Sequence, residues 1–185
     1  MPRPLAFTPL LLLAACKPPA AEGYLERVDL AQTGSFASAA QVSPATEGAG
    51  WALSQTKGRI IYGQPGGAPL VALECIGARG TAQLQLTRFA AADREAQAFA
   101  ALVGNRLVAR IPMDAVPNGR AWIWQGAMPA DHPSLDALAD PVSAELTIPG
   151  AGTTVLNPSP LPLAMLAQCR ARNAPAAPAP PANPG

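Results

Sequence analysis

The side chains of this sequence that could do chemistry are three cysteines, one histidine and 12 scattered carboxylates. The histidine, His132, stands between Asp131 and Pro133, and Asp136 follows shortly after it. A Ser-His-Asp catalyst needs a serine on a sharp strand-to-helix turn or in an oxyanion setting, and the sequence has no Gly-x-Ser-x-Gly motif. We therefore interpret His132 as a solvated loop residue and predict no catalytic residue.

The carboxylates fall into the local groups Asp93-Glu95 and Asp131-Asp136-Asp140, in predicted loops among arginines or apolar residues. A calcium loop would show Asp or Asn at alternating positions with a glycine and a late glutamate. A zinc site would need a cluster of histidines and cysteines. The sequence has neither pattern, so we predict no metal and no cofactor. Paired acids on facing strands could hydrolyse glycosidic bonds, which leaves a hydrolase as an alternative function.

The first 16 residues have the pattern of an export signal. Arg3 is the only charge before an apolar stretch that ends in small residues just ahead of Cys16. This order is typical of a secretory signal peptide, which we assign to residues 1–15. The apolar stretch, about a dozen residues, is too short for a transmembrane helix, which needs roughly 20.

The residues Leu13-Ala14-Ala15-Cys16 resemble the lipobox of bacterial lipoproteins, in which the cysteine sulfur receives a diacylglycerol and begins the mature chain. The resemblance implies lipidation at Cys16 and firm anchorage, because each buried methylene contributes about 0.8 kcal/mol. Lys17 stands where an aspartate would retain the protein, and similarity to sorting in enterobacteria therefore favours the outer membrane over the inner. The alternative is an unmodified cysteine in a plain signal or an N-terminal helix.

Cys75 and Cys169 remain once Cys16 is lipidated. A pair of cysteines in the oxidising periplasm is typical of a disulfide, and we predict one between them. Closing a loop of about 95 residues would stabilise the fold by up to roughly 4 to 5 kcal/mol. The alternative is two independent buried thiols.

Composition limits the partners and the number of domains. Removal of Arg3 with the signal takes Lys+Arg from 13 to 12, which equals the 12 acidic residues, so no basic stripe marks a nucleic-acid partner. The two ends are rich in proline and alanine, and proline removes backbone donors from helices and sheets. We expect a lipidated tether over 16–49, one β-rich domain over 50–172 and a disordered tail over 173–185.

From Trp51 onward, short apolar runs alternate with turn residues, which is typical of an antiparallel sandwich or barrel. The expected strands are 51–54, 58–62, 69–75, 80–89, 98–103, 106–113, 121–125, 142–148 and 153–156. The segment Ala91–Val103 is ambiguous: we predict a strand over 98–103 closed by a Gly104-Asn105 turn, with a short helix over 91–102 as the alternative. Pro112 suggests that its strand lies at an edge or ends there.

Two further features concern the end of the domain. Ser159 is placed to cap a C-terminal helix that would put Leu163, Leu166 and Cys169 on one face, within reach of Cys75. Trp122 and Trp124 alternate on one face of a strand; a pair of this kind belongs to the core or forms an exposed binding surface. We keep the binding surface as the functional alternative.

The strand end "LVALEC", the stretch "LDALADPVSAELTIPG" before "LNPSPLPLAMLAQCR", and the lipobox together resemble a set of uncharacterised alphaproteobacterial envelope lipoproteins of the sphingomonad type. The resemblance covers 51–172 and implies a fold and a compartment, without an activity. We expect a lipid-anchored, periplasm-facing binding or structural module that contacts an envelope protein or peptidoglycan. The alternatives are the hydrolase and a periplasmic enzyme inhibitor that inserts the loop "GQPGGAP".

Overall fold

The described part of the chain is dominated by one antiparallel sheet. The computed structural model describes residues 40–139 and 143–174. Its strands are β1 (Gly50–Leu53), β2 (Arg59–Gly63), β3 (Val71–Ile76), β4 (Gln83–Ala91), β5 (Gln97–Gly104), β6 (Leu107–Pro117), β7 (Trp122–Pro129), β8 (Ala144–Ile148) and β9 (Gly152–Leu156). A 3₁₀ helix, η2 (Pro133–Ala139), lies between β7 and β8, and the helix α1 (Pro160–Ala171) follows β9.

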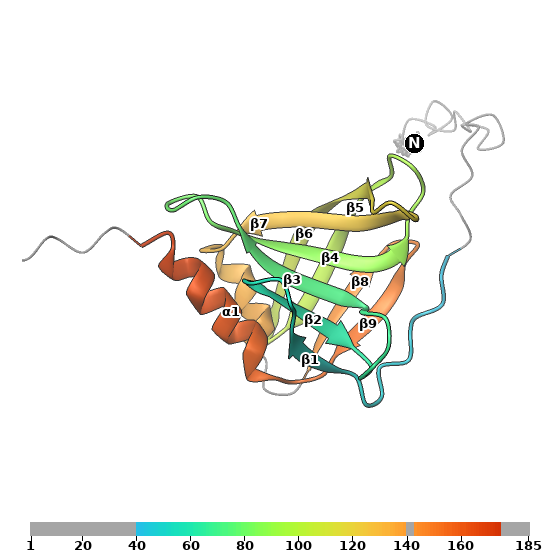
Figure 1. The fold of residues 1–185 in the computed structure, drawn as a ribbon, viewed down its shortest axis with the longest axis horizontal. Helices are drawn as coiled ribbons and strands as arrows, with labels where there is room; N and C mark the ends of the chain where they lie inside the picture. Colours follow the sequence, from blue (N-terminus) through green and yellow to red (C-terminus); the bar gives the residue numbers. More distant parts are fainter. Residues whose placement is uncertain (1–39, 140–142, 175–185) are drawn as a thin grey trace, which may run out of the picture. The chain divides into compact units, whose positions relative to one another are not determined.

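The strands pair in the order β1-β2-β3-β4-β7-β6-β5-β8-β9, and the sheet curls into a nearly closed barrel (Figure 1). Every pair of neighbouring strands is antiparallel. The predicted fold class, a mainly-β barrel-like domain with a short C-terminal helix and one disulfide, is confirmed.

The ambiguous segment after β4 is a strand, so the alternative helix over 91–102 is wrong. β5 and β6 form a hairpin whose central turn residues are Asn105 and Arg106, with φ of 47° and 58°. Positive φ at both positions is the geometry of a two-residue hairpin turn. The predicted turn, Gly104-Asn105, was one residue too early, because Gly104 still pairs with Leu107 in the ladder. A Cβ on Gly104 would lie 2.3 Å from the carbonyl oxygen of Ala137, so only glycine fits there.

Pro112 lies in a strand that has neighbours on both sides, so its prediction as an edge or terminal residue is wrong. β6 runs between β5 and β7, but its ladder with β7 covers only Asp114–Pro117. Pro112 precedes that ladder, where its missing N–H interrupts no pairing with β7. The carbonyl oxygen of Pro112 packs against Gly126 on β7. A Cβ on residue 126 would lie only 2.0 Å from this oxygen.

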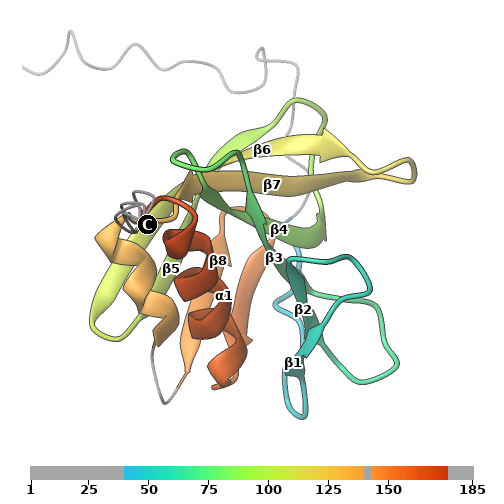
Figure 2. The same cartoon turned by 60° about the vertical axis from the view of Figure 1, so that its left-hand side comes forward.

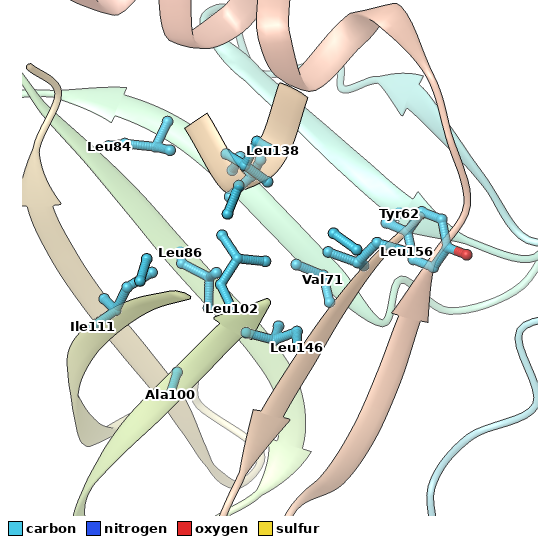
Figure 3. Packing of buried hydrophobic residues seen from close by; sticks show 14 of the residues in the cluster. Tyr62, Val71, Leu84, Leu86, Ala100, Leu102, Ile111, Leu138, Leu146 and Leu156 are labelled. Carbon is cyan, nitrogen blue, oxygen red and sulfur yellow. The ribbon is translucent and has the colours of Figure 1, made fainter. Parts of the chain in front are cut away.

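The core fills the inside of the barrel. Alternating residues of the strands point inward, and η2 adds Leu135 and Leu138 to the same cluster (Figure 3). The inward side chains labelled in Figure 3 are Tyr62, Val71, Leu84, Leu86, Ala100, Leu102, Ile111, Leu138, Leu146 and Leu156. β4 departs from the expected half-solvated alternation, because Thr87 and Arg88 near its end are also buried.

α1 packs beside η2 and against the first strands (Figure 2). Ser159 caps it as predicted, accepting a hydrogen bond from the backbone N–H of Leu161 at 3.2 Å. The buried face of α1 consists of Pro162, Met165, Leu166 and Cys169, whereas Leu163 is 45% exposed. The expected face was therefore wrong at Leu163: the helix turns its Pro162 and Met165 side toward the sheet.

Segments outside the predicted domain limits pack on the barrel. The N–H of Gln41 donates to the carbonyl of Gly150, and Ser43 Oγ accepts from the N–H of Thr153 at 2.9 Å. At the other end, the side-chain amide of Asn173 pairs with both backbone groups of Ala82. The folded unit therefore takes in residues that the sequence analysis assigned to the tether and to the tail.

Candidate functional site

Cys75 and Cys169 form the predicted disulfide, which joins β3 to α1 with the two Cα atoms 5.5 Å apart. Arg172 lies next to it: its Nη1 donates to the carbonyl of Cys75 at 3.1 Å and lies 3.2 Å from Cys75 Sγ. The same guanidinium donates to the carbonyl of Gly77. The bridge and Arg172 thus fix the end of α1 to β3. Cys16, the predicted lipidation site, lies outside the described residues.

Trp122 and Trp124 alternate along β7, but only Trp124 belongs to the core. Trp124 is 5% exposed and packs in the core, and its indole nitrogen has no hydrogen-bond partner among the described residues. Trp122 is half-buried near the barrel end, with the Arg94 guanidinium 5.8 Å from its ring centre. The two rings therefore do not form one open platform.

His132 is exposed and contacts its own neighbour Ser134. Ser134 Oγ lies 2.7 Å from His132 Nδ1, and the N–H of Ser134 donates to the same nitrogen at 3.3 Å. Because Ser134 lies in the first turn of η2, this is a local contact at a helix start. Asp136 pairs with Arg170 at 2.8 Å and is not part of a triad with them. In the described residues no group of three or more His, Cys, Asp or Glu could hold a metal ion.

The loop "GQPGGAP" borders a hollow of about 260 Å³ that it shares with β1 and β2. Gln64 at its start donates to the carbonyl of Glu47 and accepts from the N–H of Gly67, so the loop folds into a turn. The walls are mostly glycine, proline and the side of Trp51. This hollow therefore offers few polar side chains for recognition.

The outer face of the central strands offers more. On β5 and β6 the inward positions are small or apolar, so the intervening residues must point outward. Four polar side chains from β4, β7, β6 and β5 are cross-strand partners in one row: Thr87, Gln125, Asp114 and Gln97. Gln125 Nε2 donates to Thr87 Oγ1 at 3.1 Å, and Gln97 Nε2 donates to Asp114 Oδ1 at 2.8 Å. These bonds hold amide and carboxylate groups in fixed positions.

An aromatic ring stands next to this row. Phe99 lies two residues from Gln97 on the same face of β5, opposite Pro112 on β6, and it is 63% exposed. Phe99, Pro112, Gln97 and Asp114 line a groove of about 330 Å³, together with Ala98 and Met113. One step further along β6, Arg110 is exposed and makes no ion pair with a described residue. We call Gln97, Phe99, Arg110, Pro112 and Asp114 the Phe99 surface.

The Phe99 surface was not predicted from the sequence, because its strand β5 lies in the segment that is ambiguous between helix and strand. The available signal was the alternation in "QAFAALV", which places Gln97 and Phe99 opposite the small residues Ala98 and Ala100. This alternation predicts that the Phe99 ring is exposed on the outer face of the strand, beside Gln97.

Comparisons of the chain with protein-family models, with curated proteins and with solved structures found no match. Over residues 40–139 and 143–174, no helix has the length and apolar character needed to cross a bilayer.

Proposed function

We propose that this chain is a lipid-anchored binding or structural module of the bacterial cell envelope that faces the periplasm, with Cys16 as the lipidated residue. One observation carries the proposal: the Cys75–Cys169 disulfide of the folded domain. Disulfides of this kind persist in oxidising compartments and are rare in the cytosol. With these two cysteines paired, Cys16 is the one cysteine left for another role, and it follows the lipobox-like residues 13–15.

The two alternative functions gain no specific support. A hydrolase would need two close carboxylates in a pocket, and the groove at Asp114 contains no second acid. An inhibitor would need a projecting loop, whereas "GQPGGAP" folds into a turn beside β1.

The anchor is tested by growing cells that express the full chain on an alkyne fatty acid and attaching a fluorophore to the labelled protein. We expect label on the wild type and none on Cys16→Ser. The double variant Cys75→Ser/Cys169→Ser is the matched control, because it removes two thiols and should keep the label. Equal labelling of wild type and Cys16→Ser, or no label on either, contradicts the proposal.

The binding role is tested by crosslinking intact cells and identifying captured proteins by mass spectrometry. We expect an envelope component that is recovered with the wild type and lost with Cys16→Ser. Separation of inner from outer membranes in the same cells tests the expected outer-membrane location.

A further inference from the structure

We propose that the Phe99 surface binds the glycan strands of the cell wall, with one sugar ring stacked on Phe99. The inference deepens the proposed function and rests on it for the compartment, but its geometry is independent of the lipid anchor. A pyranose ring has an apolar face of C–H bonds, and an exposed aromatic ring matches that face. Phe99 is paired with Pro112 in the long β5–β6 ladder, which fixes the backbone that carries its ring; the ladder of β5 with β8 begins two residues later, at Ala101.

The polar groups beside Phe99 match the rest of an N-acetylated sugar. Sugar hydroxyls both donate and accept hydrogen bonds, and an acetamido group does the same through its N–H and its carbonyl. The Asp114 carboxylate accepts hydrogen bonds, and the side-chain amide of Gln97 has both a donor NH₂ group and an acceptor oxygen. Their mutual bond of 2.8 Å leaves Asp114 Oδ2 and the Gln97 amide oxygen for a ligand. Because this bond already exists, little side-chain freedom is lost on binding.

Arg110 supplies charge complementarity on the other side of Phe99. Residues two apart on a strand are separated by roughly 7 Å, so Arg110 and Asp114 lie on opposite sides of Pro112 along β6. The span from one to the other is about 13 Å, which suits more than one sugar residue. Cell-wall glycan carries free carboxylates on its peptide stems, and these would pair with the exposed guanidinium of Arg110.

The size of the groove favours a small repeating ligand over a protein partner. A volume of about 330 Å³ lies at the lower end of the range of roughly 300–1,000 Å³ for small-ligand sites. A stable protein interface would instead bury about 800 Å² per partner around several large apolar anchors. The groove itself offers one aromatic ring, with Pro112 and the polar side chains of Gln97 and Asp114 beside it. The exposed Val103 and Val108 lie further along the hairpin, outside the groove.

The proposal is tested on the full chain carrying Cys16→Ser, so that the acyl anchor cannot contribute. Co-sedimentation with purified peptidoglycan sacculi measures binding to the polymer, and NMR titration with the neutral oligosaccharide chitotetraose measures binding to the sugars alone. We expect both to bind, and Phe99→Ala to weaken each at least about tenfold. Phe99→Trp should retain binding, because it keeps an aromatic face. Leu53→Ala, which shortens another exposed apolar residue, is the matched control and should change neither.

Arg110→Gln separates the charged contact from the stacking contact. It should weaken binding of a muropeptide that carries free carboxylates while leaving chitotetraose binding unchanged. Equal weakening of both ligands would contradict the role of Arg110. Circular dichroism must show the same fold in every variant, which is expected because both side chains are exposed.

Three results would overturn the proposal: no binding to sacculi or chitotetraose, binding that Phe99→Ala leaves intact, or Phe99-dependent capture of a protein or of phospholipid vesicles without glycan binding. Failure of the glycan site and failure of the lipid anchor give different results. If Cys16 is not lipidated and sacculi still bind through Phe99, the anchor fails and the glycan site stands. If Cys16 is lipidated and sacculi do not bind, the glycan site fails and the lipid anchor stands.

Discussion

The hydroxyl of Tyr62 on β2 accepts a hydrogen bond from the N–H of Asn157 at 3.1 Å and donates one to the carbonyl of Val155 on β9 at 2.9 Å. Tyr62 and Val155 come from opposite ends of the strand order, where the ladder does not close. The side chain of Asn157 donates to the carbonyls of Thr46 and Ala49, at 2.9 Å each. Side-chain hydrogen bonds therefore bridge the seam of the barrel in place of a strand pair.

We predict that Tyr62→Phe destabilises the domain by about 1–2 kcal/mol, because it removes two part-buried hydrogen bonds, to the carbonyl of Val155 and from the N–H of Asn157. The ring itself is retained, so core packing should not change. Urea unfolding followed by fluorescence measures the difference in free energy of unfolding. Ser54→Ala, which removes an exposed local hydrogen bond, is the control and should change stability by less than about 0.5 kcal/mol. A Tyr62→Phe variant as stable as the wild type would show that the seam is held by packing alone.

The disulfide should contribute a large share of the stability of so small a domain. It closes a loop with a sequence separation of 94 residues, and chain entropy predicts a contribution of up to about 4 to 5 kcal/mol. We expect the variant Cys75→Ala/Cys169→Ala to lose about 2–5 kcal/mol in urea unfolding. Adding reductant should lower the stability of the wild type and leave the variant unchanged. An unaltered midpoint after complete reduction would contradict this expectation.

Glycine at position 126 is required by the close approach of β6 and β7. A Cβ there would lie 2.0 Å from the carbonyl oxygen of Pro112 and 2.6 Å from Met113 Sδ, so the two strands would have to separate. We predict that Gly126→Ala destabilises the domain by about 3 kcal/mol or more. Gly50→Ala is the matched control, because nothing lies within 4 Å of a Cβ at that strand position. Similar effects of the two changes would mean that β6 and β7 can move apart.

The sequence predicted most strands because one face of each is buried. In β6, for example, Ala109, Ile111 and Met113 alternate with exposed residues, and this period of two is visible without coordinates. The disulfide followed from a simple count of cysteines. What the sequence could not show is which distant segments meet. The Tyr62 seam depends on Asn157, far along the chain, and the exposure of Leu163 depends on how α1 rests on the sheet.

The candidate site illustrates the same limit. Gln97 and Phe99 lie on one face of β5 by local alternation alone, so their neighbourhood could be predicted once the strand was accepted. Asp114 and Gln125 join them only through the pairing of β6 with β5 and β7. The row therefore depends on strand order, which no local pattern in the sequence specifies.

Arg88 is the least favourable residue of the core. It is 4% exposed on the inner face of β4, its Nη1 donates to the carbonyl of Leu70 at 3.1 Å, and its Nε has no partner among the described residues. Desolvation by burial lowers the pKa of its guanidinium below the ordinary value. The carbonyl of Leu70 also accepts from the N–H of Phe89 at 3.0 Å, so it would keep a partner without the arginine.

We predict that Arg88→Met stabilises the domain by about 1 kcal/mol or more, because an apolar side chain replaces a buried charge that has no ion-pair partner among residues 40–139 and 143–174. The folded pKa is lower than the unfolded pKa, so the unfolded state binds the proton more tightly and stability rises with pH only in the alkaline window between the two. Between pH 5 and 8 both states stay protonated, and the gain from Arg88→Met should be constant there. Urea unfolding at several pH values measures it, with the exposed Arg120→Met as the control. A loss of stability in Arg88→Met would show that the bond to Leu70 outweighs the desolvation of the charge.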